Sequence, residues 1–151
     1  MFNNTPEITA HKPTQQDIVI KYMCLMDLDM VETLLGPDFC PIDITKGALF
    51  GWFRQAMDLF EKHGDKELTM KPGFCTACCM HCVAFSFIGK QSAIELRVRF
   101  TLNNQLITDI SICNFFYYTK MIEEKKKVIK MDLTDPSFPR AVVVDYVFPI
   151  I

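Results

Sequence analysis

The sequence predicts an α+β fold in which N-terminal helices pack on one side of a strongly curved antiparallel β-sheet. Apolar residues recur at helical spacing through the first part of the chain, as far as His63. Beyond Gly64, apolar and polar residues alternate, which is typical of strands with one buried face. Helices followed by a run of strands form the α+β pattern.

Two short helices are predicted before residue 36. Thr14 is a good N-cap for the first, and Asp17 completes an acidic variant of the capping box. The segment 27–29, Asp-Leu-Asp, is expected to end the first helix and begin the second. Gly36-Pro37 ends the second, because glycine suits the position past a helix end and proline cannot continue a helix.

The clearest helix is predicted from Thr45 to His63. Its polar face carries charged residues, and His63 lies at the negative end of the helix, where a cation is favoured. Gly64 follows as the cap. The opposite face is apolar and contributes to the predicted core with Leu49, Phe53, Ala56, Met57 and Phe60.

Strands are predicted at 67–70, before Pro72-Gly73, and at 83–88, 92–102 and 105–118, with two more at 125–131 and 141–151. A tight hairpin turn is expected at Asn103-Asn104, because asparagine tolerates a positive φ. Strand 92–102 alternates most clearly. One side is expected to be buried (Ile94, Leu96, Val98, Phe100) and the other to face solvent (Glu95, Arg97, Arg99).

Length and charge limit the function classes. The 151 residues suit one domain, expected at 14–151, preceded by a flexible polar arm at 1–13. Eighteen acidic and 16 basic residues give a net charge of −2, which predicts neither nucleic acid nor an anionic membrane as a partner. No signal-peptide pattern and no run of 18 apolar residues occurs. Together with the seven cysteines, which suit a reducing compartment, this predicts a cytoplasmic protein.

Four of the cysteines fall within eight residues, at Cys75, Cys78, Cys79 and Cys82. The Cys75-x-x-Cys78 spacing is that of a zinc knuckle, in which two thiolates on one turn hold the same ion. Zinc is therefore the expected cofactor, with Cys82 as the third ligand. The fourth is expected to be Cys113, with His81 as the alternative. Buried thiols, which are common in protein cores, and a redox role are the alternatives to metal binding.

Two segments, 17–37 and 83–116, carry a resemblance to a known superfamily. The first contains Tyr-Met-Cys-Leu-Met-Asp-Leu-Asp at 22–29, where one helix breaks at an acidic residue into the next. The second contains Leu-Asn-Asn-Gln-Leu-Ile-Thr-Asp-Ile at 102–110, a hairpin followed by an Ile-Thr-x-Ile strand. These resemble the nuclear-transport-factor-2-like superfamily, which includes the SnoaL-like and ketosteroid-isomerase-like proteins. The cysteine-rich segment departs from its general pattern.

The resemblance implies a cystatin-like cone, in which the sheet wraps the long helix and leaves a pocket. Members include isomerases, cyclases, ligand-binding proteins and association modules, so the fold sets no reaction. Tyr22, Trp52, Phe53 and Asp109 are the candidate pocket residues, although Trp52 and Phe53 also suit core packing.

Three functions remain open for such a cone. The first is binding of a small apolar ligand, with zinc fixing the cysteine-rich segment. The second is a pocket enzyme that transfers a proton, with Asp27, Asp29 or Asp109 as the carboxylate and Tyr22, Tyr117 or Tyr118 as the donor. Its catalytic residues are unknown. The third is a homodimeric association module that uses the open face of the sheet, the aromatic run 115–118 and the apolar end 147–151.

Overall fold

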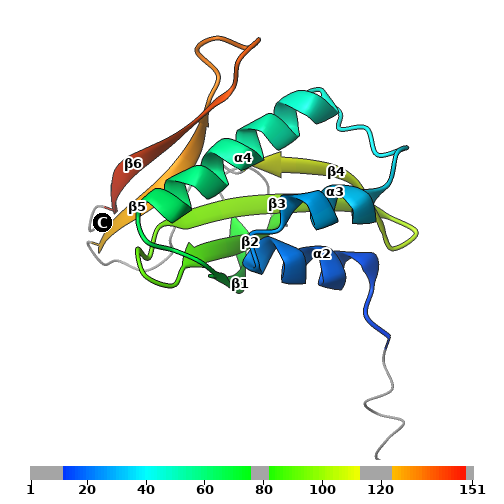
Figure 1. The fold of residues 1–151 in the computed structure, drawn as a ribbon, viewed down its shortest axis with the longest axis horizontal. Coiled ribbons are helices and arrows are strands. Elements are labelled where there is room, and N and C mark those ends of the chain that lie inside the picture. The colour runs from blue at the N-terminus through cyan, green and yellow to red at the C-terminus, as the bar shows by residue number, and fades with distance from the viewer. Residues whose placement is uncertain (1–11, 76–81, 113–123, 149–151) are drawn as a thin grey trace, which may run out of the picture.

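The computed structural model of the chain describes residues 12–75, 82–112 and 124–148. These residues form three helices and a six-stranded, mostly antiparallel sheet, which confirms the predicted α+β class (Figure 1). The helices are α2 (Gln15–Cys24), α3 (Leu28–Leu35) and α4 (Lys46–Lys62). The strands are β1 (Leu68–Cys75), β2 (Cys82–Gly89), β3 (Glu95–Asn103), β4 (Leu106–Ile112), β5 (Glu124–Asp132) and β6 (Arg140–Phe148).

The helices begin where the sequence predicts them. Thr14 and Asp17 form a capping box at the start of α2. The side chain of Asp27 accepts a hydrogen bond from the backbone N–H of Met30, so it caps α3 and breaks the chain between the two helices. Thr45 caps α4 in the same way. Each cap satisfies a backbone donor that the first helical turn leaves without an intrahelical partner.

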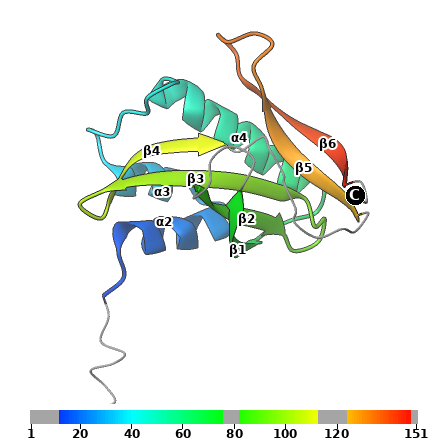
Figure 2. The same ribbon diagram turned by 180° about the vertical axis from the view of Figure 1, so that it is seen from behind.

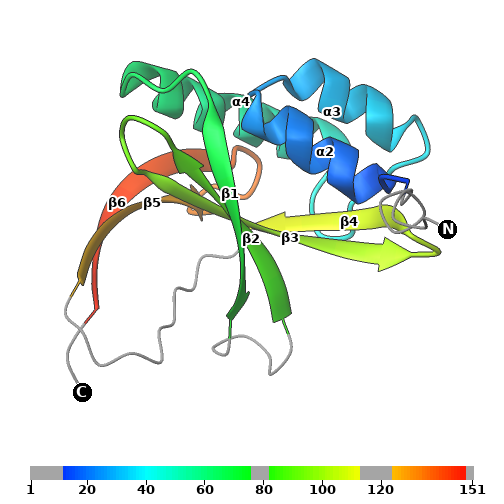
Figure 3. The same cartoon turned by 90° about the horizontal axis from the view of Figure 1, so that it is seen from below.

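All three helices lie on one face of the sheet (Figure 3). The residues of α4 that face the sheet are almost fully buried, and Trp52, Phe53 and Phe60 are among the largest of them. From the sheet, the alternating residues Leu96 and Val98 of β3 meet them. The core therefore lies between α4 and the sheet, as predicted.

In the described part of the chain, no helix has the length and hydropathy that a membrane crossing needs.

The central strand β3 organises the sheet. One of its edges pairs with β2 over Glu95–Val98. Its other edge is shared, because Glu95 pairs in parallel with Val128 of β5 while Val98–Asn103 pair with β4. Beyond this shared edge β4 and β5 run in different directions (Figure 2). We call the region between the diverging β4 and β5–β6 hairpin the wedge.

Strand β1 is longer than predicted and runs through Pro72 and Gly73 to Cys75. Pro72 pairs in register with Phe85 of β2. The expectation that this proline would end the strand is wrong because β1 lies at the edge of the sheet. An edge strand needs backbone donors on only one side, so it tolerates a residue without an N–H.

The predicted solvent-facing side of β3 is also wrong in part, because Glu95 and Arg97 are only 4% and 7% exposed. Their side chains lie 3.3 Å apart as an ion pair, and Nε of Arg97 donates to Oγ of Ser86 on β2. The parallel partner Val128 lies beside Glu95 and is itself fully buried. Strand β3 thus buries a charged pair on the side that the alternation predicted to face solvent.

The β3–β4 turn lies one residue later than predicted. Its two positive-φ residues are Asn104 and Gln105, between the paired Asn103 and Leu106. Such a two-residue turn matches the twist of the strands that it joins.

Candidate functional site

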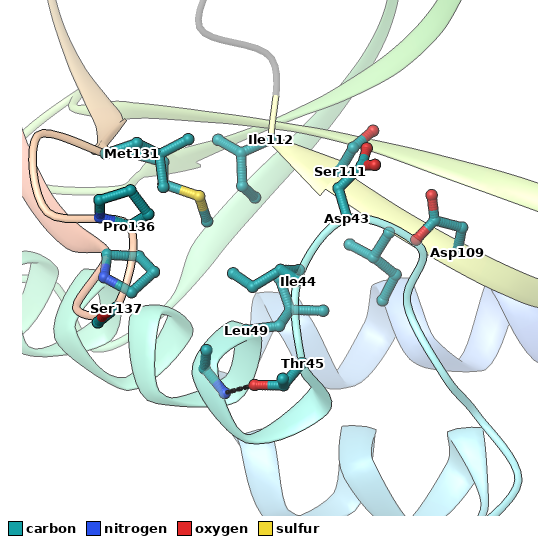
Figure 4. Close-up of a pocket in the computed structure, with 14 residues that line it drawn as sticks. Asp43, Ile44, Thr45, Leu49, Asp109, Ser111, Ile112, Met131, Pro136 and Ser137 are labelled. Carbon is teal, nitrogen blue, oxygen red and sulfur yellow. Dashed lines mark hydrogen bonds between the residues drawn. The ribbon is translucent and has the colours of Figure 1, made fainter.

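The candidate site is a cavity of about 460 Å³ in the wedge between β4 and the β5–β6 hairpin, beside the start of α4 (Figure 4). Ligand pockets in proteins commonly measure about 300 to 1,000 Å³. Most of its lining residues are apolar, and a smaller number are polar. The lining residues are Asp43, Ile44, Thr45, Ala48, Leu49, Asp109, Ile110, Ser111, Ile112, Met131, Leu133, Pro136, Ser137 and Pro139.

The start of α4 forms one wall. Oγ1 of Thr45 accepts a hydrogen bond of 3.1 Å from the N–H of Ala48, which fixes the first helical turn. Leu49, 1% exposed, then points from the helix toward the sheet and closes the inner side of the cavity. The N-cap that begins the helix therefore also shapes this wall.

Strand β4 forms the second wall and supplies its best-fixed polar group. Oδ1 of Asp109 accepts a hydrogen bond of 3.1 Å from the backbone N–H of Ile42, in the loop before α4. This bond joins residues 67 positions apart in the chain and orients the half-buried carboxylate. Next along the wall, Oγ of Ser111 accepts from Nε of Arg99 on β3 at 3.1 Å.

The β5–β6 hairpin forms the third wall and is tied to α4 by three hydrogen bonds. Nε1 of Trp52 donates to the carbonyl of Arg140 at 3.0 Å. The Gln55 amide donates to the carbonyl of Pro139 at 3.1 Å and accepts from the N–H of Ala141 at 3.0 Å. Two side chains of one helix thus hold the base of the loop that carries Pro136.

Exposed apolar side chains lie around the cavity. Leu133, which lines it, is 53% exposed. Phe138 is 71% exposed and lies between the lining residues 137 and 139, while Ile42 is 76% exposed and precedes Asp43. Of these three residues, Leu133 is the one whose side chain lines the cavity.

The four predicted pocket residues lie in different places. Asp109 lines the cavity. Trp52 and Phe53 lie in the core, 0% and 1% exposed, and their rings meet edge-on with centroids 5.5 Å apart. Tyr22 packs half-buried against the core from α2. The structure therefore brings only Asp109 of these four to this cavity.

The other two candidate carboxylates, Asp27 and Asp29, stabilise the helices and do not line the cavity. Asp27 caps α3, and Asp29 lies 3.4 Å from Arg54 in an exposed ion pair. Sequence reasoning did not single out the remaining lining residues. The helix cap at Thr45 and the Asp-Pro turn at 135–136 were visible in the sequence, but nothing in it indicated that they meet.

The structure describes only part of the predicted zinc site. The register of the β1–β2 hairpin places the backbone of Cys75 opposite that of Cys82. Cys78, Cys113 and the alternative ligand His81 lie outside the described residues. Within the residues described, no three His, Cys, Asp or Glu side chains are grouped so that they can hold a metal ion.

The cavity offers an apolar space with carboxylate and hydroxyl groups along part of its wall. Its polar lining residues are Asp43, Thr45, Asp109, Ser111 and Ser137, and no histidine, lysine or arginine is among the described lining residues. Such a surface can hold an apolar molecule and accept hydrogen bonds from it. Comparisons with protein-family models, curated proteins and solved structures found no match to this chain.

Proposed function

We propose that the chain is a small-ligand-binding domain and that the cavity beside α4 holds a small apolar ligand. The observation that carries this proposal is the cavity itself, about 460 Å³ with mainly apolar walls. Ligand pockets are typically apolar concave sites with a few fixed polar groups. Asp109, oriented by the Ile42 N–H, is such a group.

The construction of the walls supports the same proposal. The cavity lies where two strands leave one edge of β3, and side-chain hydrogen bonds of α4 and β4 hold the surrounding loops. A preformed space of this kind spares a ligand the free-energy cost of ordering its site. Leu133, a lining residue that is 53% exposed, extends the apolar surface outward from it.

Filling the cavity tests this function. We expect Nile red, a neutral apolar dye, to bind the wild-type protein with a rise in fluorescence. Ala48→Phe places a ring in the lining and should abolish that rise. Gly47→Phe is the matched control, because a side chain at Gly47 meets nothing within 4 Å and this residue is not in the lining. Equal binding by the two variants would rule out the cavity as the site.

We also propose that the fold is the cone of the nuclear-transport-factor-2-like superfamily. The bent sheet, with α4 on one face and two shorter helices beside it, supports this proposal (Figure 3). So does the break at Asp27, where one helix ends and the next begins. A crystal structure in which the sheet does not curve around α4 would contradict it.

A structural zinc held by Cys75, Cys78, Cys82 and Cys113 remains part of the proposal. The opposed positions of Cys75 and Cys82 on neighbouring strands support it, because ligands to one ion must converge. Thiolates suit zinc, and zinc bound there would tie the end of the β1–β2 hairpin to a neighbouring segment. Free thiolates persist in a reducing compartment, so a cytoplasmic location belongs to the same proposal.

The alternative function is a pocket enzyme that transfers a proton on a small apolar substrate. The observation in its favour is Asp109, a half-buried carboxylate fixed at the wall of the cavity. Deuterium exchange at the carbon next to the carbonyl of a bound ketone would reveal such an activity, and Asp109→Asn should abolish it.

We propose a homodimer as the assembly. None of the described helices covers the sheet face opposite α2, α3 and α4 (Figure 3). Glu95 and Arg97 on this face are buried, but Arg99 further along β3 is partly exposed, which supports pairing through that end of the face. Light scattering at high micromolar concentration should give twice the mass of the chain, whereas the mass of one chain would contradict the dimer.

A further inference from the structure

We propose that the ligand of this cavity carries a protonated amine at one end of an apolar body, and that Asp109 binds the amine. The inference rests on the proposed function, because it requires a ligand in the cavity. It adds the chemical class of that ligand and the residue that selects it.

The shape of the cavity separates a polar part from an apolar part. Figure 4 shows Asp109 and Ser111, both from β4, on one side. Met131 and Pro136, from the β5–β6 hairpin, lie on the other, and Ile44 lies between the two sides. A molecule that spans the cavity therefore meets a carboxylate at one end and, at the other, apolar side chains with the single hydroxyl of Ser137.

The charges of the lining favour a cation. Asp43 and Asp109 are the charged residues among the described lining residues, and both are negative. A ligand that fills the cavity removes water from these carboxylates, and a cationic group is the ligand end that best offsets this loss. A ligand carboxylate would meet two like charges in the same space.

Two positive groups lie near this wall, and each has a partner. Nε of Arg99 donates to Oγ of Ser111 from the neighbouring strand, and Arg99 is not in the lining. The N-terminus of α4 carries a partial positive charge of about half a unit. Oγ1 of Thr45 already accepts from the Ala48 N–H there. Arg99 keeps its full positive charge, because the Ser111 hydroxyl is neutral, so the two carboxylates exceed these positive charges by about half a unit.

Asp109 is better placed than Asp43 to select the ligand. The Asp43 side chain is exposed, whereas Asp109 is half-buried and oriented by the Ile42 N–H at 3.1 Å. That bond uses one acceptor site of Oδ1. A carboxylate offers about four acceptor sites, so Asp109 keeps capacity for an ammonium group, which is a donor only.

Three probes with the same aromatic body test the class of ligand: naphthylethylamine, naphthylethanol and naphthylacetate. Titrations by fluorescence at neutral pH should give a dissociation constant at least tenfold lower for the amine than for the acetate. Asp109→Asn keeps an oxygen for the Ile42 N–H but loses the charge. It should weaken the amine at least tenfold and leave the alcohol within twofold. Asp58→Asn, an exposed change on α4 away from the lining, should alter none of the three.

Binding of the alcohol distinguishes the proposed function, an apolar ligand in the cavity, from the further inference that this ligand is an amine. If the alcohol binds and Ala48→Phe blocks it, while amine and acetate bind equally, the proposed function stands and the amine inference is overturned. An amine preference that survives Asp109→Asn also overturns it. If none of the three probes binds, the cavity does not hold apolar ligands of this size, and the inference falls with the proposed function.

Discussion

The indole Nε1 of Trp52 donates a hydrogen bond of 3.0 Å to the carbonyl of Arg140, 88 residues away in the sequence. Trp52 is 0% exposed, so a core residue of α4 also fixes the start of β6. Together with Gln55, it holds the loop that forms one wall of the cavity. The stability of the fold and the shape of the cavity are therefore linked through α4.

Gln55→Ala should lower the free energy of unfolding by about 1 kcal/mol, because a part-buried hydrogen bond to the Pro139 carbonyl and an exposed one from the Ala141 N–H are lost. The same change should weaken Nile red binding, since the cavity wall is released. Asp58→Ala, an exposed change on the same helix, is the control. Urea unfolding and dye titration measure the two effects. Unchanged stability in Gln55→Ala would show that the loop is held by other contacts.

Asp65 holds the β2–β3 turn, and its loss should be more costly. The buried carboxylate accepts from the N–H groups of Gln91 and Ser92 at 2.7 and 3.0 Å, and also from the Ser92 hydroxyl. Gly89 leaves room for it, because a Cβ there would collide with Asp65. Asp65→Ala removes three part-buried hydrogen bonds to one buried carboxylate, so we expect a loss of about 3 kcal/mol in urea unfolding.

Glu67→Ala provides the matched comparison, because Glu67 is an exposed carboxylate two residues further on. Its hydrogen bond from Lys90 lowers the pKa of Glu67, with the charge of Lys90 adding to the effect. The pair's contribution is therefore present at neutral pH and lost as acid protonates Glu67. We expect a far smaller loss than for Asp65→Ala. Equal losses in the two variants would contradict the role of Asp65 as the anchor of the turn.

Thiol reactivity should distinguish Cys24 from Cys40. Cys40 is exposed and should be alkylated readily. Burial raises the pKa of the Cys24 thiol, and the charge of Lys90 offsets part of this effect. Because the thiolate is the nucleophile, Cys24 should react later and need a higher pH.

The same shift has a consequence for stability. A raised pKa in the folded state means that the contribution of Cys24 is present below its unfolded pKa and is lost as pH rises through the folded pKa. Peptide mass spectrometry after timed iodoacetamide treatment reports each cysteine separately. Faster modification of Cys24 than of Cys40 at neutral pH would contradict the burial of this thiol.

The sequence predicted the features whose causes lie within a few residues, and it missed those that depend on residues far apart in the chain. The caps at Thr14, Asp27 and Thr45 act within one helical turn, so the sequence predicted where each helix begins. Glu95 is buried, and it pairs with Val128, 33 residues further along the chain. No local pattern indicates such a parallel contact, so the sequence predicted an exposed side instead.

The same limit applies to the site. The sequence singled out Asp109, which lines the cavity, but grouped it with Trp52 and Phe53, which lie in the core. An aromatic residue on an apolar helix face looks the same whether it lines a pocket or fills a core. The cavity exists because β4 and β5 share one edge of β3, and that sharing is a property of the whole sheet.

Metal content tests the zinc proposal. One zinc ion per chain should survive purification without added metal, and chelation should lower the melting temperature, because metal bound to the folded state adds stability. Cys75→Ser should abolish the metal, whereas Cys79→Ser, the expected non-ligand, should retain it. Elemental analysis decides between them. Metal-free protein with four titratable thiols at 75–82 would contradict the zinc site and show that these cysteines are ordinary free thiols.

Methyl NMR of the wild-type protein titrated with naphthylethanol tests the central claim most directly, because it locates a bound ligand residue by residue. Ile112 and Met131 line the cavity, whereas Ile20 and Met23 lie in the core on α2. The cavity account predicts saturable shifts of the Ile112 and Met131 methyl signals, with the Ile20 and Met23 signals unmoved. Saturable shifts confined to residues away from the cavity, or none at all, would contradict it.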